Sequence, residues 1–350
     1  MKVISQLKLA ILVNWKEEGH WPFPAQLRQK VQSVDILQQL SFKIPFSGRL
    51  NYISKYLSEF YIPLLALIQR QRFDVIVSWQ MRIGVCYGLL KRLCHFNKLP
   101  VHIIQDFHID LTQTRGLYRL KLALLKLAIP GIDFFFCTST EEEAIYSQMF
   151  NIPRNRIAFL PLVQAASIFE ETSYPKKDYI FSFGNSDRDF DTLIQAVTPL
   201  NFNTYILSQK YKPKIPVPAN VFIMREYVSD KEMIQWIASS RMVILPIKDY
   251  QVSAGQFSML EVMALARPLI ITENLCAKEY LVHQHSALFF KARSDKELAD
   301  HIRYLWNHRE SAEQLGQEAR QAALKLGDKR MTAFINLLDI CAMDLQKGKH

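Results

Sequence analysis

Short apolar runs alternate along the chain with segments of helical periodicity, and this alternation restricts the fold more than any other feature. The predicted strands are Leu9–Val13, Phe73–Trp79, Val101–Gln105, Phe134–Ser139, Tyr179–Gly184, Thr204–Ser208, Val221–Met224, Met242–Pro246 and Leu269–Thr272. The predicted helices include Gly84–His95, Leu117–Ala128, Thr140–Phe150, Phe190–Ala196, Ser229–Ser239 and Ser258–Ala266. Strands that are apolar throughout are typical of parallel sheets covered by helices on both faces. The sequence therefore predicts an α/β protein.

The segment Pro161–Asp178 interrupts this alternation, since it is polar, contains two prolines and has no clear period. A chain of 350 residues is long enough for two domains. We expect two Rossmann-like doubly wound domains at 1–165 and 178–325, a linker at 166–177, and a C-terminal helical segment at 326–350 that packs back on the first domain. Doubly wound sheets bind ligands at the carboxyl ends of their strands, so we expect the site in the cleft between the domains.

The positive charge is concentrated in the first half of the chain. Residues 1–165 contain 20 Lys and Arg against 11 Asp and Glu, whereas the other 185 residues contain 23 against 22. This asymmetry predicts an anionic partner: nucleic acid, an anionic membrane surface or a phosphorylated substrate. Because the sequence has no recognised nucleic-acid-binding motif, we favour a lipid surface or a lipid-linked phosphate acceptor over nucleic acid.

One predicted helix of the basic half is amphipathic. At 100° per residue, Arg115, Arg119 and Lys126 fall on one side and several leucines on the other. The helix is either half-buried with a solvated basic face or placed against anionic lipid. Upstream, Tyr52, Tyr56, Phe60 and Tyr61 interleave with Arg49 and Lys55, which predicts either an aromatic surface or ordinary core packing.

Cysteine spacing and hydropathy indicate the compartment. The five cysteines are odd in number and scattered, which argues against a disulfide framework and a zinc site. The apolar stretch near the N-terminus is too short for a signal peptide, and no run of 18 apolar residues occurs. His283 and His285 have no further ligand close in sequence, so we expect no metal. The expected location is the cytoplasm, on the inner face of the membrane.

The segment Ser253–Thr272 shows the most informative local pattern, a glycine-containing loop, a helix and a strand. A helix start offers free N–H groups and a positive dipole end to a diphosphate. Ser258 is expected to cap this helix, and the carboxylate of Glu261 is placed to accept both hydroxyls of a ribose diol. The alternative is a capped surface helix whose glutamate complements the dipole.

The residues Leu260–Ile270 resemble the LEAMA-x-G-x-PVI segment of glycosyltransferase family 4 and related GT-B enzymes. The resemblance continues in order through 178–325, including the entry strand and turn at 181–190, the Tyr227–Glu232 segment and the strand Val243–Pro246. It implies a GT-B fold whose second domain binds a nucleotide-sugar, with a UDP- or GDP-sugar as donor and no cofactor. The donor-binding residues that it implies are Gly184, Asn185, Arg188, Val228, Lys248, Ser253, Gly255, Ser258, Leu260 and Glu261.

The chain departs from the family pattern at three places. Ser253 stands where the family has the first glutamate of its E-x7-E motif, and Asn185 stands where it has an arginine. The family's N-terminal glycine-rich loop is replaced by residues 14–20. Arg188 takes the position of the usual lysine, where a guanidinium can bind a diphosphate bidentately and stabilise the leaving group. Lys248 follows the next strand and either lines the cleft or is solvated.

His108 follows the predicted strand Val101–Gln105, and many family members have a histidine there that touches the donor sugar. The alternative is a packing or loop histidine; Asp106 and Asp110 flank it as candidate partners. With Arg188, it is our candidate catalytic residue. The function implied is hexosyl transfer to a sugar or lipid-linked acceptor, retaining and metal-independent, in cell-surface glycan biosynthesis. The alternatives are a catalytically degenerate GT-B scaffold protein and a GT-B nucleotide-sugar epimerase.

Overall fold

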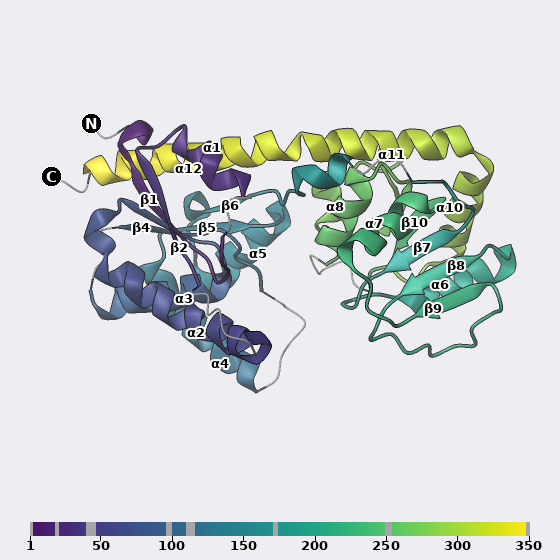
Figure 1. Ribbon diagram of the computed structural model, residues 1–350, viewed down its shortest axis with the longest axis horizontal. Coiled ribbons are helices and arrows are strands. Elements are labelled where there is room, and N and C mark those ends of the chain that lie inside the picture. Colours follow the sequence, from purple (N-terminus) through teal and green to yellow (C-terminus); the bar gives the residue numbers. More distant parts are fainter. Residues whose placement is uncertain are drawn as a thin grey trace. The chain divides into compact units, whose positions relative to one another are not determined.

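The computed structural model describes residues 3–17, 21–39, 47–95, 100–109, 116–170, 174–248 and 254–347. The chain forms two compact units, one built from Met1–Leu160 together with Met331–His350 and the other from Pro161–Arg330. Each unit contains a parallel sheet with helices on both faces (Figure 1). The α/β architecture predicted from the alternating pattern is therefore confirmed.

The sheet of the first unit has six parallel strands in the order β2-β1-β3-β4-β5-β6. They are β1 (Lys8–Leu12), β2 (Ser33–Leu37), β3 (Val75–Ser78), β4 (Val101–Ile104), β5 (Phe134–Cys137) and β6 (Ile157–Phe159). In register, Leu9 pairs with Val75, and Val75 pairs with Val101. All residues of β3, β4 and β5 are buried, which explains why these segments are apolar except for Ser78 and His102, whose side chains share a hydrogen bond of 2.9 Å.

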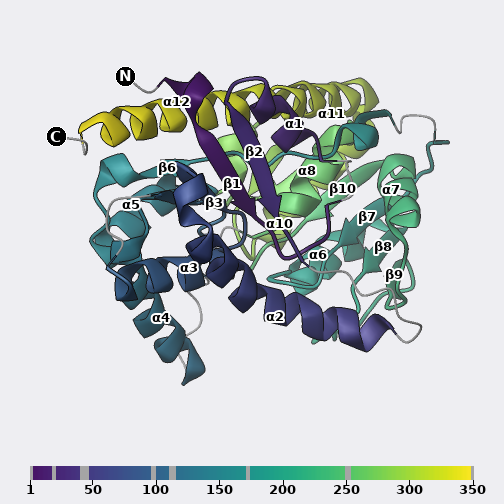
Figure 2. The same cartoon turned by 60° about the vertical axis from the view of Figure 1, so that its left-hand side comes forward.

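Helices cover both faces of the first sheet. They are α1 (Pro22–Arg28), α2 (Ser47–Ile68), α3 (Met81–Leu93), α4 (Leu117–Ala128) and α5 (Thr140–Phe150). On one face, Phe23 of α1 packs in a core with Phe334 and Leu338 of the last helix, α12 (Leu326–Lys347). On the other face, α2, α3, α4 and α5 cover the sheet, with α3 between α2 and α4 (Figures 1 and 2).

The second sheet also has six parallel strands, in the order β12-β11-β10-β7-β8-β9. They are β7 (Ile180–Phe183), β8 (Thr204–Leu207), β9 (Val221–Met224), β10 (Met242–Leu245), β11 (Leu269–Thr272) and β12 (Leu288–Phe290). This is the doubly wound order in which the chain reverses its direction across the sheet between β7 and β10. Ligands of such sheets bind at this switch point, outside the carboxyl ends of the strands.

The helices of the second unit are α6 (Phe190–Val197), α7 (Asp230–Ser239), α8 (Gln256–Ala264), α9 (Ala277–Tyr280), α10 (Asp295–Asn307) and α11 (Arg309–Leu324). One face of the sheet packs against α6 and α10, in a core that includes Ile180 and Leu298. On the other face, Phe181 stacks on Trp236 of α7, and α8 packs beside α7. Successive residues of β7 therefore point to the two opposite faces of the sheet, and both faces are covered by helices.

Three parts of the fold differ from or complete the sequence predictions. Helix α12 packs in the core of the first unit, as expected for a helix that returns to the first domain. The segment 166–177, expected as a linker, belongs to the second unit, and Ile168 is buried there. The sequence analysis missed strands β2 and β6 and helices α1 and α2. Asp35 breaks the apolar run of β2, and α2 contains Pro63.

Within the described ranges, none of the helices combines the length and the hydropathy needed to cross a bilayer.

Candidate functional site

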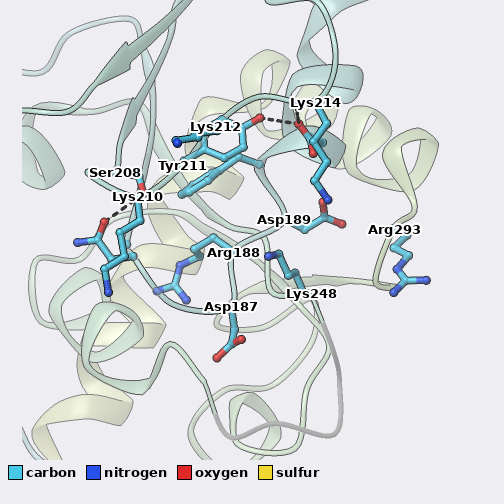
Figure 3. A pocket seen from close by; sticks show the side chains of 14 residues that line it. Asp187, Arg188, Asp189, Ser208, Lys210, Tyr211, Lys212, Lys214, Lys248 and Arg293 are labelled. Carbon is cyan, nitrogen blue, oxygen red and sulfur yellow. Dashed lines mark hydrogen bonds between the residues drawn. The ribbon is translucent and has the colours of Figure 1, made fainter. Parts of the chain in front are cut away.

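A pocket of about 510 Å³ lies at the switch point of the second sheet. Its walls come from the loops that follow β7, β8, β10 and β12, as Figure 3 shows. Four of the residues expected to bind a donor line it together: Gly184, Asn185, Arg188 and Lys248. Backbone bonds fix the loops to each other, since Arg188 and Ile247 form an antiparallel bridge and the Lys248 N–H donates to the Asp187 carbonyl at 3.0 Å.

Arg188 lies at the centre of this pocket and is almost entirely buried. Its Nε donates to the Phe183 carbonyl at 3.0 Å, its Nη1 to the Ser186 carbonyl at 2.9 Å, and its Nη2 to the Ser258 hydroxyl at 3.1 Å. These acceptors are neutral, and Arg188 has no carboxylate ion pair with any described residue. Burial lowers the pKa of the guanidinium to about 10, so it remains a cation at neutral pH. A buried cation with neutral acceptors is poised to bind an anion.

Two glycines make room for the Arg188 side chain. Gly184 has φ +127°, and a Cβ atom there would lie 2.7 Å from Nε and 2.8 Å from Nη2 of Arg188. Gly255 has φ +81°, and a Cβ atom there would lie 3.4 Å from Nη1 and 3.0 Å from Ile247. Both positions therefore require glycine for conformation, and Gly184 requires it for space as well.

Further cations surround Arg188. They are Lys210, Lys212 and Lys214 on the connection between β8 and β9, Lys248 after β10, and Arg293 after β12. All five are exposed, and none has an ion pair within the part of the chain that the structure describes. The pocket is consequently electropositive, although three aspartates also line it.

Two of these three aspartates are already engaged. Asp189 caps α6 by accepting from the backbone N–H and hydroxyl of Thr192. Asp191 accepts from the Tyr211 hydroxyl at 2.7 Å and from the Lys214 backbone N–H at 3.1 Å. Their carboxylates therefore hold the loops in place, and neither forms an ion pair with the cations named above.

Ser258 does not have the role expected from sequence. Helix α8 begins at Gln256 with Gly255 at the N-cap, so Ser258 is its third residue and no side chain caps the helix. The prediction that Ser258 caps the helix is wrong, because the left-handed conformation that ends the preceding loop requires glycine. The Ser258 hydroxyl instead accepts from Arg188 and thereby connects the start of α8 to the pocket.

Glu261 lies further along α8 and is half-buried. Its carboxylate has no hydrogen-bond partner among the described side chains. Burial, and to a lesser degree the charge of Asp230 at the start of α7, raise the pKa of Glu261 to about 7. A carboxyl group whose burial is not compensated by donors is a candidate ligand-binding group. The structure does not bring Glu261 into the wall of the pocket around Arg188.

The remaining donor-binding candidates are placed as follows. The Asn185 side chain accepts from the Ser208 hydroxyl and the Gln209 backbone N–H, so it ties the loops after β7 and β8 together. Val228 is half-buried in the loop before α7 and does not line the pocket. Leu260 is completely buried, so its side chain is part of the core. Ser253 lies outside the described residues.

His108 belongs to the first unit, in the segment after β4. Its Nδ1 lies 3.3 Å from Oε1 of Glu142, which is at the start of α5, and its side chain is 40% exposed. Glu142 also accepts from the Thr138 N–H and hydroxyl and from the Tyr146 hydroxyl. Burial alone would raise the pKa of Glu142, but the bonds from His108 and Thr138 outweigh it and lower the pKa. Of the two aspartates that flank His108 in sequence, Asp106 is exposed and Asp110 lies outside the described residues.

Helix α4 presents a different face from the one expected. Arg119 and Lys126 are exposed, as predicted, whereas Arg115 lies outside the described residues. The sequence placed the leucines on the side opposite the cations, but the core side of the helix is formed by Leu125 and Ala128. Three of the leucines are exposed instead, at 56% for Leu120, 41% for Leu124 and 48% for Leu127.

Some functional candidates were missed from sequence. Lys210, Lys212 and Lys214 recur at every second residue directly after a predicted strand, and this alternation was a usable signal for a basic loop edge. Glu142 and Arg293 gave no comparable signal, because each is brought to its neighbours by the packing of segments that are distant in sequence. Among the described residues, no group of three His, Cys, Asp or Glu side chains is arranged to hold a metal ion.

Residues 217–322 match the family model described as glycosyl transferases group 1. No curated protein matches the chain in sequence. Similar solved structures include HepE of Anabaena in complex with UDP, with 10% identity, TM-score 0.63, and coverage of 95% of this chain and 99% of HepE. Sucrose-phosphate synthase of Thermosynechococcus elongatus gives 13% identity, TM-score 0.63 and 98% coverage of both chains. A glycosyltransferase of Rickettsia africae gives 12% identity, TM-score 0.62, and coverage of 95% of this chain and 98% of that structure.

At these identities the structural matches establish the fold, and the family match lies within the second unit. The chain has the GT-B fold of two Rossmann-like domains, as the resemblance in its second half implied.

Proposed function

We propose that this GT-B glycosyltransferase of the group 1 type transfers a hexosyl group from a UDP-sugar to a hydroxyl of a sugar or lipid-linked sugar. The observation that carries the proposal is the Arg188 guanidinium, buried without a carboxylate partner at the switch point of the second sheet. HepE, which shares the fold, was solved with UDP and with UDP-glucose, and this supports UDP over GDP as the nucleotide of the donor.

The chemistry assigned to the pocket is stabilisation of the leaving group. The bond between the anomeric carbon and the diphosphate oxygen breaks, and a bond to the acceptor oxygen forms. The acceptor proton leaves on the diphosphate. Arg188, Lys248 and the N-terminus of α8 stabilise the charge that develops on the diphosphate, so we propose a metal-independent reaction. Retention of configuration and a role in cell-surface glycan biosynthesis follow from the family resemblance.

Donor specificity is assigned to Glu261. At pH values above its pKa of about 7, the carboxylate can accept two hydrogen bonds from the ribose diol of the donor. His108 is assigned to the donor sugar, with Glu142 as the group that positions its ring. Both assignments rest on the family resemblance. The half-buried position of Glu261 supports the first, and the contact between His108 and Glu142 supports the second.

We also propose that the enzyme works on an acceptor at an anionic membrane surface. The sequences of α2, α3 and α4 together contain eight Lys and Arg residues and one acidic residue, Glu59. Glu59 is buried and pairs with Arg82 at 3.3 Å. The three helices lie side by side on one face of the first sheet (Figures 1 and 2), so this layer carries an excess of cations, although Lys91 is buried and pairs with Asp133. Such a layer attracts anionic lipid.

Apolar side chains on the same layer favour lipid over a soluble anion. On α2, Leu57, Phe60, Leu64 and Ile68 are exposed, Phe60 at 65% and Ile68 at 68%, and their spacing places them on one stripe. On α4 the leucine stripe is flanked by Arg119 and Lys126 on one side and Lys121 on the other. An apolar stripe bordered by cations is the pattern of a helix that lies in the membrane interface.

Turnover of a radiolabelled donor tests the reaction. We expect labelled UDP-sugar to yield a labelled glycan only when an acceptor is present, and Arg188→Gln to abolish it. Release of UDP or a rearranged sugar without any acceptor would favour an epimerase. Tight UDP binding without turnover on any acceptor would favour a scaffold protein. A parallel series with GDP-sugars checks the choice of base.

A further inference from the structure

The pocket around Arg188 contains more positive charge than a nucleotide-sugar diphosphate requires. The diphosphate of such a donor carries two negative charges, which Arg188 and Lys248 match. Four further cations line the same cavity: Lys210, Lys212, Lys214 and Arg293. They form no ion pair with any part of the protein that the structure describes. Three aspartates, Asp187, Asp189 and Asp191, also line the cavity, so its six cations leave a net charge of +3 against the two negative charges of the diphosphate.

The cations are also spread too widely for one diphosphate. Lys210, Lys212 and Lys214 follow β8, and Arg293 follows β12. Four strand spacings separate β8 from β12 in the sheet, and at roughly 4.8 Å each this places the two loops about 19 Å apart at their bases. Figure 3 shows the lysines and Arg293 around the rim, with Arg188 and Lys248 between them. A ligand that contacts the whole rim therefore needs anionic groups at more than one point.

The three lysines are held in position rather than placed at random on a free loop. Tyr211, between two of them, packs its ring against Phe190 of α6 with centroids 4.9 Å apart and donates to Asp191. The Lys214 backbone N–H donates to the same carboxylate. Tyr211 lines the pocket together with Lys210 and Lys212, so its contacts with α6 fix the backbone that carries the two lysines.

We infer that this pocket recognises a sugar that carries its own anionic group, a phosphate or a carboxylate, in addition to the diphosphate of the donor. The group contacts Lys210, Lys212, Lys214 and Arg293. It belongs either to the donor sugar, as in a uronic acid, or to a phosphorylated acceptor. The inference rests on the proposed function for the diphosphate part of the site.

Calorimetric titrations with paired ligands distinguish the two sources. The first pair is UDP-glucose and UDP-glucuronic acid, and the second is glucose and glucose 6-phosphate added to protein saturated with UDP. In at least one pair, the charged member is expected to bind about tenfold tighter than the neutral one. The preference should weaken as salt is added, because exposed charges are screened.

Two triple variants show whether the lysines are responsible. The pocket variant combines Lys210→Gln, Lys212→Gln and Lys214→Gln. It should lose the preference for the charged ligand, while its affinity for UDP changes by no more than about threefold. The control variant combines Lys177→Gln, Lys296→Gln and Lys325→Gln, which removes the same charge from the second unit at positions away from the pocket. Its preference for the charged ligand should stay within about twofold of that of the wild type.

The inference is overturned if neither charged ligand is preferred, or if the control variant loses the preference as fully as the pocket variant. Failure of the donor assignment gives a different result. In that case UDP and GDP do not bind the wild type. Inorganic phosphate still raises the melting temperature of the wild type but not that of the pocket variant. This result would support the anion site without the proposed donor.

Discussion

The Nη2 atom of Arg188 donates a hydrogen bond to the Ser258 hydroxyl at 3.1 Å, across 70 residues of sequence. This bond joins the loop after β7 to the first turn of α8. The two anion-binding features of the second unit, a buried guanidinium and a helix N-terminus, are therefore held in one arrangement before any ligand binds. Such preorganisation lowers the cost of ordering the site on binding.

Replacing Ser258 by alanine tests this connection. Ser258→Ala removes one acceptor from a buried guanidinium, and we expect the free energy of unfolding to fall by about 1–3 kcal/mol. UDP affinity should fall as well, because Arg188 loses a fixed orientation. Urea unfolding and calorimetry measure the two effects. Unchanged values in both would show that water replaces the hydroxyl without consequence.

Gly184 provides a steric test of the same site. In Gly184→Ala the new Cβ would lie within 2.8 Å of the Arg188 guanidinium at a backbone φ of +127°, so both the loop and the arginine must shift. We expect a loss of about 1–3 kcal/mol of stability and a large loss of UDP affinity. Gly327→Ala is the matched control, since nothing lies within 4 Å of its added Cβ in α12, and it should be neutral or slightly stabilising.

The sequence predicted the sheets well because buried parallel strands are continuous apolar runs, which are visible without any partner. It failed for β2, where Asp35 interrupts the run, and for α2, where Pro63 disguises a helix of 22 residues. The contacts of the site were less predictable. Arg188 was identified by resemblance, but its bond to Ser258 depends on the packing of segments distant in sequence, which local periodicity does not encode.

Glu261 should make donor binding depend on pH. Glu261→Gln is expected to weaken UDP binding by about 1.5–3 kcal/mol at pH 8, where the carboxylate is ionised. In the wild type, affinity should fall as the pH drops through about 7, because the protonated acid loses charge-assisted bonds to the ribose. Calorimetry between pH 6 and 8.5 would reveal this slope, and it should be absent from the variant.

The same residue makes a prediction for stability. The folded pKa of Glu261 is about 7, above its unfolded value, so the stabilisation by its proton is complete below pH 4.5 and is lost as the pH rises through 7. Above pH 7, Glu261→Gln should therefore be more stable than wild type by about 1–3 kcal/mol. The exposed Glu310→Gln serves as control and should show no such gain.

Glu142 should have the opposite pH dependence. Its folded pKa is lowered, so its contribution to stability is present above the unfolded value of 4.5 and is lost as the pH falls through the folded value. Glu142→Gln should cost about 1–3 kcal/mol at pH 7 and much less near pH 3. Thermal unfolding across this range measures the difference. Glu141→Gln, at an exposed position of the same helical turn, should be nearly neutral; an equal loss there would contradict the assignment.

Binding to anionic vesicles should have two separable components. Arg119→Gln with Lys126→Gln should weaken binding at low salt by about 1 kcal/mol per residue, and adding Arg115→Gln extends the test to the full set predicted from sequence. Leu120→Gln with Leu124→Gln and Leu127→Gln should remove the part of binding that survives at high salt.

Co-sedimentation with phosphatidylserine vesicles at 50 and 500 mM salt measures both components, with the Lys177, Lys296 and Lys325 variant as charge control. If that control releases the protein as readily as the α4 variants do, the attraction reflects net charge and the α2–α4 layer has no special role. Equal binding by wild type and all α4 variants would equally exclude docking through α4.

The core of the first unit contains residues from both sides of the second unit in the sequence. Phe334 packs 5.2 Å from Phe23 and 5.8 Å from Phe136, centroid to centroid. During synthesis, the ribosome must add the whole of Pro161–Arg330 before Phe334 exists, which takes about 10–30 s at typical rates. For that interval, one apolar face of the first sheet has no helix α12 to cover it, and we expect a nascent chain that depends on chaperones until translation has passed residue 345.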